Sequence, residues 1–380
     1  MGAPPWDALS GQYQLQPGVP CSIVGQRPIL GAGRLGRLLR GQQGPQVTRT
    51  LTQVFTLCAH AHQRTAELAL AAAQAHSAAA GANASSGPLY VETARDHLRS
   101  IALDWPQRLP DLTPATPDLA WLRDCPLPLS ASRPCTDSTQ AWALLGQLRA
   151  WLEQRVLGQA LADWLDAHRD PDALAVWCHA KAAHLSPLRS LCAWHPIAHT
   201  LAPETRCLEV LDTDSERQSA QLHQLAQALS DEPDFVQRPT WLGRCAETGP
   251  WARLRHRRPA APAHNAWTRV SARWLELMEI AAASPRPPGP GDPPLLASGA
   301  LRLGDGQALA WCEMARGLLL HWVQLDATGA VHDYRVLAPT EWNFHPQGAL
   351  AKALSALPPE NTAAARVLAA AYDPCVACTV

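Results

Sequence analysis

The sequence has little charge, and the charge it has is balanced. Charged residues make up 17% of the 380 residues, and 32 Lys and Arg face 33 Asp and Glu. This balance gives no electrostatic reason to expect nucleic acid or an anionic membrane as a partner. The stretch from Met1 to Trp6 lacks the basic and apolar regions of a secretory signal. Because no uncharged apolar run is long enough to span a bilayer, we expect a cytoplasmic protein.

The even, closely spaced cysteines of a small disulfide-bonded domain are also missing. The 11 cysteines are scattered, and we expect most of them to be reduced and buried. The end of the chain differs, because Cys375 and Cys378 form a C-x-x-C that follows Asp373-Pro374. Two thiolates at this spacing can bind one transition metal, and the proline restricts the backbone before the first. Zinc sites and redox disulfides share this spacing, so the motif does not decide the chemistry.

Hydrophobic periodicity favours an α+β protein that is mostly α, a helical bundle with small sheet elements. The predicted helices cover 47–80, 91–103, 142–165, 171–183, 216–230, 265–283, 346–357 and 361–371. Short strands are expected within 12–31, and a hairpin at 318–337, with Gly329 in its turn. The Pro-rich segment 284–294 should be a surface loop.

A further cysteine lies far upstream, in the stretch Cys58-Ala-His-Ala-His62. On the expected helix Cys58 and His62 are one turn apart and share a face. Taken alone this is a weak signal, because a buried packing pair explains it equally well.

The C-terminal D-P-C-x-x-C is similar to the end of the large subunit of nickel–iron hydrogenases. Five stretches earlier in the chain also resemble motifs of that family and occur in the same order. Leu38–Gln42 resembles its first motif region, and Gln53–His62 stands in place of its C-x-x-C-x-x-x-H. Ala246–Arg253 is similar to the family's E-x-G-P-L-A-R, Glu313–Trp322 to its E-A-P-R-G-x-x-x-H-W, and Pro339–Asn343 to its P-T-x-W-N. The resemblance implies one large-subunit-like domain over residues 1–380, in which Cys58 and Cys378 meet.

The departures from that family bear on function. Its upstream cysteine pair supplies one terminal nickel ligand and one thiolate that bridges to iron, and its C-terminal pair repeats this order. Here Phe55 replaces the first of these cysteines, while Cys58, Cys375 and Cys378 remain. The resemblance thus implies that Cys58 and Cys378 face iron and that nickel is not bound. It also implies lost proton delivery, because Gly36 stands where the family's R-G-x-E has its glutamate in ungapped register.

The family's iron carries two cyanides and one carbon monoxide, an anionic unit whose burial requires charge and hydrogen bonds. The resemblance implies that Arg316 donates to one cyanide, and that Thr340, behind Pro339, donates to the other. An ordinary ion pair between Arg316 and Glu313 is the alternative. His62 is expected near the bridging sulfur.

These features resemble the inactive, large-subunit-like hydrogenase expression/formation proteins of the HupK/HoxV type. The resemblance implies a scaffold, not an enzyme, that receives the iron–dicyanide–carbonyl fragment from hydrogenase maturation proteins, a small iron-fragment chaperone and its complex. It would hold the fragment between Cys58 and Cys378, with help from Cys375, and pass it to the apo large subunit. A metal-free chaperone of the large subunit remains open. So does a structural zinc site formed by Cys58, His62, Cys375 and Cys378. An oxidoreductase is least favoured.

Overall fold

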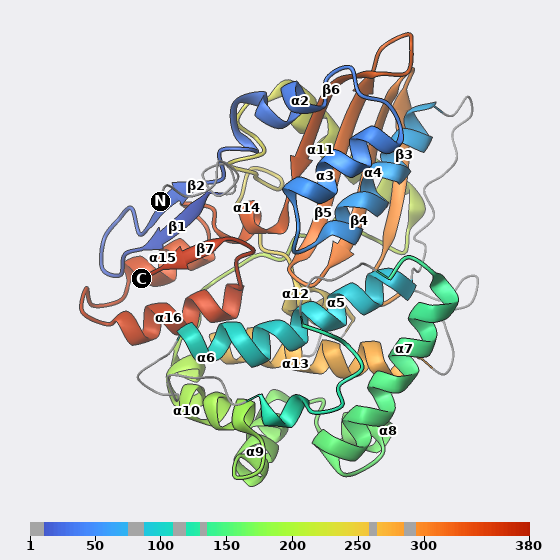
Figure 1. Ribbon diagram of the computed structural model, residues 1–380. Coiled ribbons are helices and arrows are strands. Elements are labelled where there is room, and N and C mark those ends of the chain that lie inside the picture. The colour runs from blue at the N-terminus through green and yellow to red at the C-terminus, as the bar shows by residue number, and fades with distance from the viewer. Residues whose placement is uncertain (1–10, 75–86, 109–118, 130–134, 258–263, 285–293) are drawn as a thin grey trace, which may run out of the picture.

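The computed structural model describes residues 11–74, 87–108, 119–129, 135–257, 264–284 and 294–380. The expected Pro-rich loop lies almost wholly outside these residues. The rest is mostly helical with two small sheets, which confirms the predicted class (Figure 1). In the part of the chain that is described, no helix has both the length and the apolar character needed to cross a membrane.

The larger sheet is an antiparallel meander in the order β3-β4-β5-β6. Its strands are β3 (Ser298–Gly304), β4 (Gln307–Met314), β5 (Gly317–Leu325) and β6 (Val331–Leu337). The predicted hairpin is therefore confirmed as β5 and β6, whereas β3 and β4 were not foreseen. Side chains alternate between the two faces of β4, so that Ala310 and Cys312 join one hydrophobic cluster while Leu309 and Trp311 join the other.

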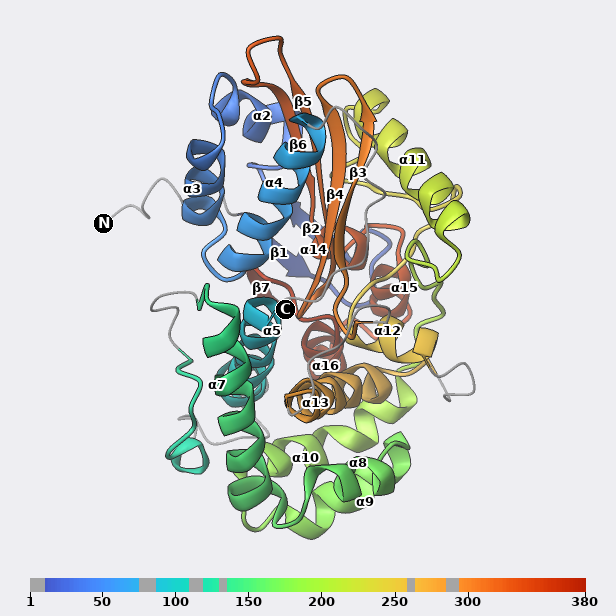
Figure 2. The ribbon, with the colours of Figure 1, turned by 90° about the vertical axis from the view of Figure 1, so that its right-hand side faces the viewer.

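Helices cover both faces of this sheet (Figure 2). On one face lie α2 (Arg34–Leu39), α3 (Pro45–Val54) and α4 (Ala59–Gln74), and on the other lies α11 (Ser215–Asp231). Small buried residues such as Ala61 and Ala69 let α4 approach the strands closely. The single helix expected over 47–80 is divided, because the chain leaves helical geometry at Phe55 and re-enters it at Ala59.

Beside the larger sheet and its covering helices lies a helical bundle around α13 (Ala266–Ala282), which is buried along most of its length. Around it pack α5 (Gly87–Arg99), α7 (Ser138–Trp151), α8 (Leu161–Ala167), α9 (Pro171–Lys181), α10 (Ser186–Thr200) and α16 (Thr362–Tyr372). The sequence did not predict α10, which contains Pro196 in its interior. The shorter helices are α6 (Trp105–Arg108), α12 (Pro250–Arg257), α14 (Pro339–Asn343) and α15 (Ala349–Ser355).

A three-stranded sheet in the order β2-β1-β7 joins the two ends of the described chain (Figure 1). The short strands expected within 12–31 are confirmed as β1 (Gln12–Leu15) and β2 (Ile23–Gln26), which form an antiparallel pair that the sequence did not predict. The short β7 (Ala377–Thr379), which carries Cys378, pairs in parallel with β1. The C-x-x-C is thereby fixed against the N-terminal hairpin.

Candidate functional site

Cys58 lies in the break between α3 and α4, and not inside one helix as the sequence suggested. It is buried, with 5% of its surface exposed, and directly precedes the first residue of α4. Glu92 of α5 accepts hydrogen bonds from the backbone N–H groups of His60 at 2.8 Å and Ala61 at 2.9 Å. A carboxylate at this position satisfies N–H groups that a helix start leaves free and suits the helix dipole. Glu92 therefore holds the turn that positions Cys58.

The C-terminal cysteines follow a tight turn at the end of α16. Asp373 takes a left-handed conformation, with φ 43°, which turns the chain away from the helix. Pro374 follows, and then Cys375, whose Sγ lies 3.2 Å from the hydroxyl oxygen of Thr340. Thr340 directly follows Pro339, the first residue of α14, and both are buried. The threonine expected to bind a cyanide thus contacts a C-terminal thiol.

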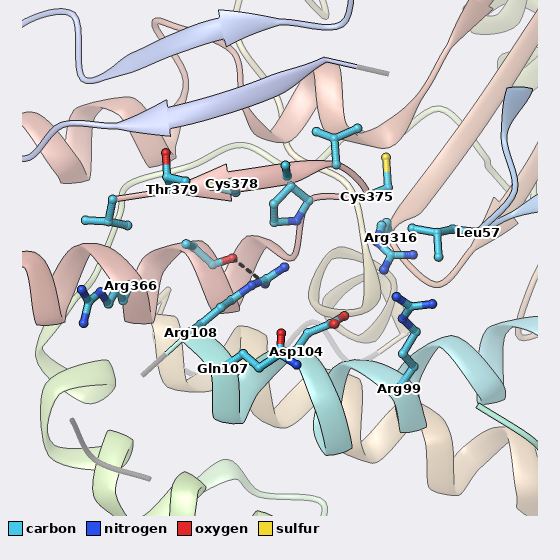
Figure 3. A pocket seen from close by; sticks show the side chains of 15 residues that line it. Leu57, Arg99, Asp104, Gln107, Arg108, Arg316, Arg366, Cys375, Cys378 and Thr379 are labelled. Atoms are coloured by element: carbon cyan, nitrogen blue, oxygen red, sulfur yellow. Dashed lines mark hydrogen bonds between the residues drawn. The ribbon is translucent and has the colours of Figure 1, made fainter. Parts of the chain in front are cut away.

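Two cavities flank the C-terminal segment. The larger, about 720 Å³, is lined by Cys58, Cys375, Arg27 and Phe55, among others. The second, about 570 Å³, is lined by Cys375 and Cys378 together with several arginines: Arg99, Arg108, Arg316 and Arg366 (Figure 3). Cys375 therefore faces both cavities, whereas Cys58 and Cys378 line different ones.

The cysteine side chains of the described residues do not converge on one metal-binding position. Among the described residues, no three His, Cys, Asp or Glu side chains are grouped so that they could hold a metal ion. Cys58 shares a cavity with Cys375, and Cys375 shares the other cavity with Cys378, whereas the resemblance implied that Cys58 and Cys378 form the pair.

Burial keeps two of these thiols protonated near neutral pH. It raises the pKa of Cys58 well above its ordinary value, and the neighbouring Cys375, Glu92 and Asp96 raise it further. Burial also raises the pKa of Cys378 to about 11. Because metals bind thiolates, a metal bound by these groups must displace their protons.

Arg316 is buried beside the cysteines, with 3% of its surface exposed. Its Nη1 lies 3.2 Å from Asp96, and its Nε lies 3.4 Å from the Asp373 carboxylate and donates to the Asp373 carbonyl at 3.2 Å. Glu313 instead accepts from the Ala297 N–H at 2.9 Å, so the alternative ion pair between Arg316 and Glu313 is wrong. Two carboxylates thus orient a guanidinium that lines the cavity containing Cys375.

Asp373 links this guanidinium to the rest of the bundle. Its carboxylate accepts from Arg108 at 3.1 Å and from the Ser100 hydroxyl at 3.0 Å, and Arg273 lies 3.7 Å away. Burial alone would raise its pKa, but Arg273, Arg316 and Arg108 hold the pKa well below its ordinary value. The sequence pointed to Asp373 only through D-P-C-x-x-C, and nothing in it pointed to Asp96.

His62 holds Phe55 in place. The two rings stack with centroids 3.8 Å apart and planes 4° apart. The Nδ1 of His62 lies 3.0 Å from the Nε2 of His321, whose Nδ1 is 2.7 Å from the Tyr334 hydroxyl. Burial lowers the pKa of both histidines, that of His321 to about 3, so both are neutral. His62 thus contacts His321 through its Nδ1 and Phe55 through the face of its ring, and the sequence predicted neither contact.

The expectation based on Gly36 is not supported by its position. Gly36 packs against β6, where an added Cβ would lie 2.5 Å from the Asp333 carboxylate. It lines a separate cavity of about 240 Å³, to which no cysteine contributes.

Comparison with known proteins agrees with this architecture. The family model described as nickel-dependent hydrogenase matches residues 300–380. Hydrogenase expression/formation protein HoxV of Cupriavidus necator is 40% identical, covering 98% of this chain and 96% of its own. Hydrogenase expression/formation protein HupK of Rhizobium leguminosarum bv. viciae is 30% identical, covering 90% and 88%.

A solved NAD+-reducing [NiFe]-hydrogenase aligns with 93% of this chain and 92% of its own, at 15% identity and a TM-score of 0.48, too distant to support a conclusion. The extent of the match to HoxV is what assigns the family. The chain belongs to the HoxV/HupK family of hydrogenase expression/formation proteins.

Proposed function

We propose that this chain is a maturation scaffold that transiently holds the iron–dicyanide–carbonyl fragment and delivers it to the apo large subunit of a hydrogenase. It would receive the fragment from maturation proteins and would catalyse no reaction itself. The expression/formation role in the names of its relatives supports this general role. The observation that carries the specific proposal is the cavity that Cys58 and Cys375 share.

We place the capture of the fragment on these two cysteines. The cavity of about 720 Å³ provides space for an iron carrying three diatomic ligands and for a donor group that presents it. Cys378, which the resemblance pairs with Cys58, would become a ligand once the C-terminal segment has shifted. Transfer onward is then favoured, because the acceptor offers a complete thiolate set and this chain has Phe55 instead of one thiolate.

The surroundings suit an anionic cargo. Iron with two thiolates, two cyanides and one carbonyl is a dianion, and a buried dianion needs cations and donors around it. Arg316 lines the cavity beside Cys375, and the Thr340 hydroxyl lies at the Cys375 sulfur. Both are held by neighbouring groups before any ligand arrives, which reduces the ordering cost of binding.

Infrared spectroscopy tests this proposal directly. The full chain is purified from an anaerobic host that carries the maturation genes, and its cyanide and carbonyl stretching bands are recorded. We expect bands in the wild type, their loss in Cys58→Ala and Cys375→Ala, and no change in Cys192→Ala. Cys192 is a suitable control because it is a partly buried cysteine of α10 that lines neither cavity.

The outcomes separate the alternatives. Bands that persist in a Cys58→Ala/Cys375→Ala double variant would contradict capture at these thiols. Loss in Cys378→Ala as well would assign the stable bridge to Cys58 and Cys378. If hydrogenase matures normally with alanine at all three positions, the chain acts as a metal-free chaperone. One zinc per chain and no iron would instead indicate a structural zinc site.

A further inference from the structure

Arg27 differs from a buried arginine that is fully paired. Arg269 binds Glu247 through Nε and Nη2 at 3.0 and 2.8 Å, and its Nη1 donates to the carbonyl groups of His264 and Asn265 at 2.9 and 3.0 Å. Arg27 reaches Glu341 only through Nη1, at 3.5 Å to each carboxylate oxygen. Within the described structure its buried Nε has no hydrogen-bond partner. A guanidinium with unused donors and 6% exposure is costly unless a ligand completes its contacts.

The position of Arg27 indicates what that ligand is. The side chain lines the same cavity as Cys58 and Cys375, and its guanidinium carbon lies 5.6 Å from the centroid of the Phe55 ring. Burial would lower its pKa, but Cys375 and Glu341 raise it above the ordinary value, so the group stays charged. Arg27 therefore places a positive charge, and one N–H group that has no partner in the described structure, at a cavity that two cysteines also line.

Two other buried arginines with unused donors do not share this setting. The Nη1 of Arg253 has no hydrogen-bond partner among the described residues, and Arg253 lines neither cavity beside the cysteines. Arg273 has no hydrogen-bond partner at Nε or Nη1 among the described residues. It lines a cavity of only about 20 Å³ to which no cysteine contributes. Such a volume accepts about one water molecule. Unused donors alone thus do not indicate a cargo site, but unused donors that face paired thiols do.

We propose that Arg27 is a further cargo-binding residue, which donates to a cyanide of the iron fragment and offsets its negative charge. This inference rests on the proposed function. Arg316 and Arg27 line different cavities that meet at Cys375, so an iron bound there would have a guanidinium on each side. The Arg27 guanidinium, 5.6 Å from the centroid of the Phe55 ring, would neutralise part of the negative charge of the fragment.

The test compares three variants of the full chain loaded with the iron fragment in the maturation host. Retention is followed as the decay of the cyanide and carbonyl bands after addition of an iron chelator. We expect Arg27→Gln to lose the fragment about tenfold faster, the effect of one charge-assisted hydrogen bond. Arg27→Lys keeps the charge but loses the planar arrangement of donors. Its rate of fragment loss should therefore lie between those of the wild type and Arg27→Gln, and a cyanide band should shift.

Glu341→Gln is the matched control, because it removes the acid that faces Arg27 and leaves the guanidinium in place. It should retain the fragment at least as long as the wild type. Thermal unfolding of the iron-free chains separates loss of fold from loss of binding. If Arg27→Gln does not fold, the cyanide band of Arg27→Lys decides the matter.

Unchanged decay and unmoved cyanide bands in the Arg27 variants would overturn this inference while leaving the proposed function intact. A wild-type chain without any bands would overturn both.

Discussion

At the scale of single residues, Phe55 is enclosed by two side chains of different chemistry. Its ring lies between the His62 imidazole, stacked at 3.8 Å, and the Arg27 guanidinium at 5.6 Å. The phenyl group cannot donate to a metal. It also gives the cavity that Cys58 and Cys375 line an apolar wall.

Replacing Phe55 by cysteine should convert the cavity into a better site for soft divalent metals. The new thiol would join Cys58 and Cys375, and we expect Phe55→Cys to bind Zn²⁺ or Ni²⁺ more tightly than the wild type in a chelator competition assay. Loss of the ring should also lower the free energy of unfolding of the metal-free chain by about 2–4 kcal/mol. Phe55→Leu, apolar and without a thiol, is the control. Equal metal affinity in the Cys and Leu variants would show that position 55 does not face the metal.

At the scale of elements, the break between α3 and α4 creates the site. The break leaves the first N–H groups of α4 free, and Glu92 of α5 accepts two of them. Burial and the nearby Asp96 raise the pKa of Glu92 to about 7, although these two N–H donors oppose the rise. The helix start that positions Cys58 thus depends on a carboxyl group that titrates near neutral pH.

This shift gives the folded protein a specific pH dependence. Between the ordinary value near 4.5 and about 7, folded Glu92 retains a proton that the unfolded chain releases. The free energy of unfolding therefore falls as pH rises through this window. In Glu92→Gln this contribution disappears, so urea unfolding at pH 5 and pH 8 should differ less than in the wild type. Glu67→Gln, at an exposed position of α4, should behave like the wild type. Parallel profiles for the wild type and Glu92→Gln would refute the assignment.

The sequence predicted elements better than it predicted their junctions. Periodicity located α9 and α11, which each bury one face, the almost wholly buried α13, and the β5–β6 hairpin, which turns at a glycine. It missed the break before Ala59, since no Gly or Pro marks it and the stabilising carboxylate comes from a different helix. Local sequence carries no signal for such a contact between distant segments.

For the site, sequence motifs identified individual side chains but not their partners. Cys58, Arg316 and Thr340 were named from motifs, and the structure places all three near Cys375. Arg27 has no recognisable motif and is brought to the cavity only by tertiary folding. Cys58 and Cys375, which are far apart in sequence, likewise line one cavity only through tertiary folding, which no local pattern encodes.

At the scale of the whole molecule, the two ends of the chain close the site together. The N-terminal hairpin supplies β1, and the last strand β7 pairs with it, with Tyr13 opposite Cys378. The Tyr13 ring packs on Phe344, with ring centroids 5.1 Å apart. The strand pair is short, so this side chain should contribute much of what holds the C-terminal cysteines in place. Opening this sheet would further expose the partly exposed Cys375 and Cys378.

Removing the Tyr13 ring should therefore loosen the C-terminal segment selectively. We expect Tyr13→Ala to accelerate alkylation of Cys378 by iodoacetamide more than about tenfold, since a lost core aromatic costs about 3 kcal/mol and alkylation proceeds through local opening. Peptide mass spectrometry gives the rate for each cysteine. The exposed Cys21 serves as an internal reference that should react equally in all variants. Tyr13→Phe keeps the ring and should react like the wild type. If Cys378 reacts no faster in Tyr13→Ala, the N-terminal hairpin does not control access to the thiols, and release must follow a different motion.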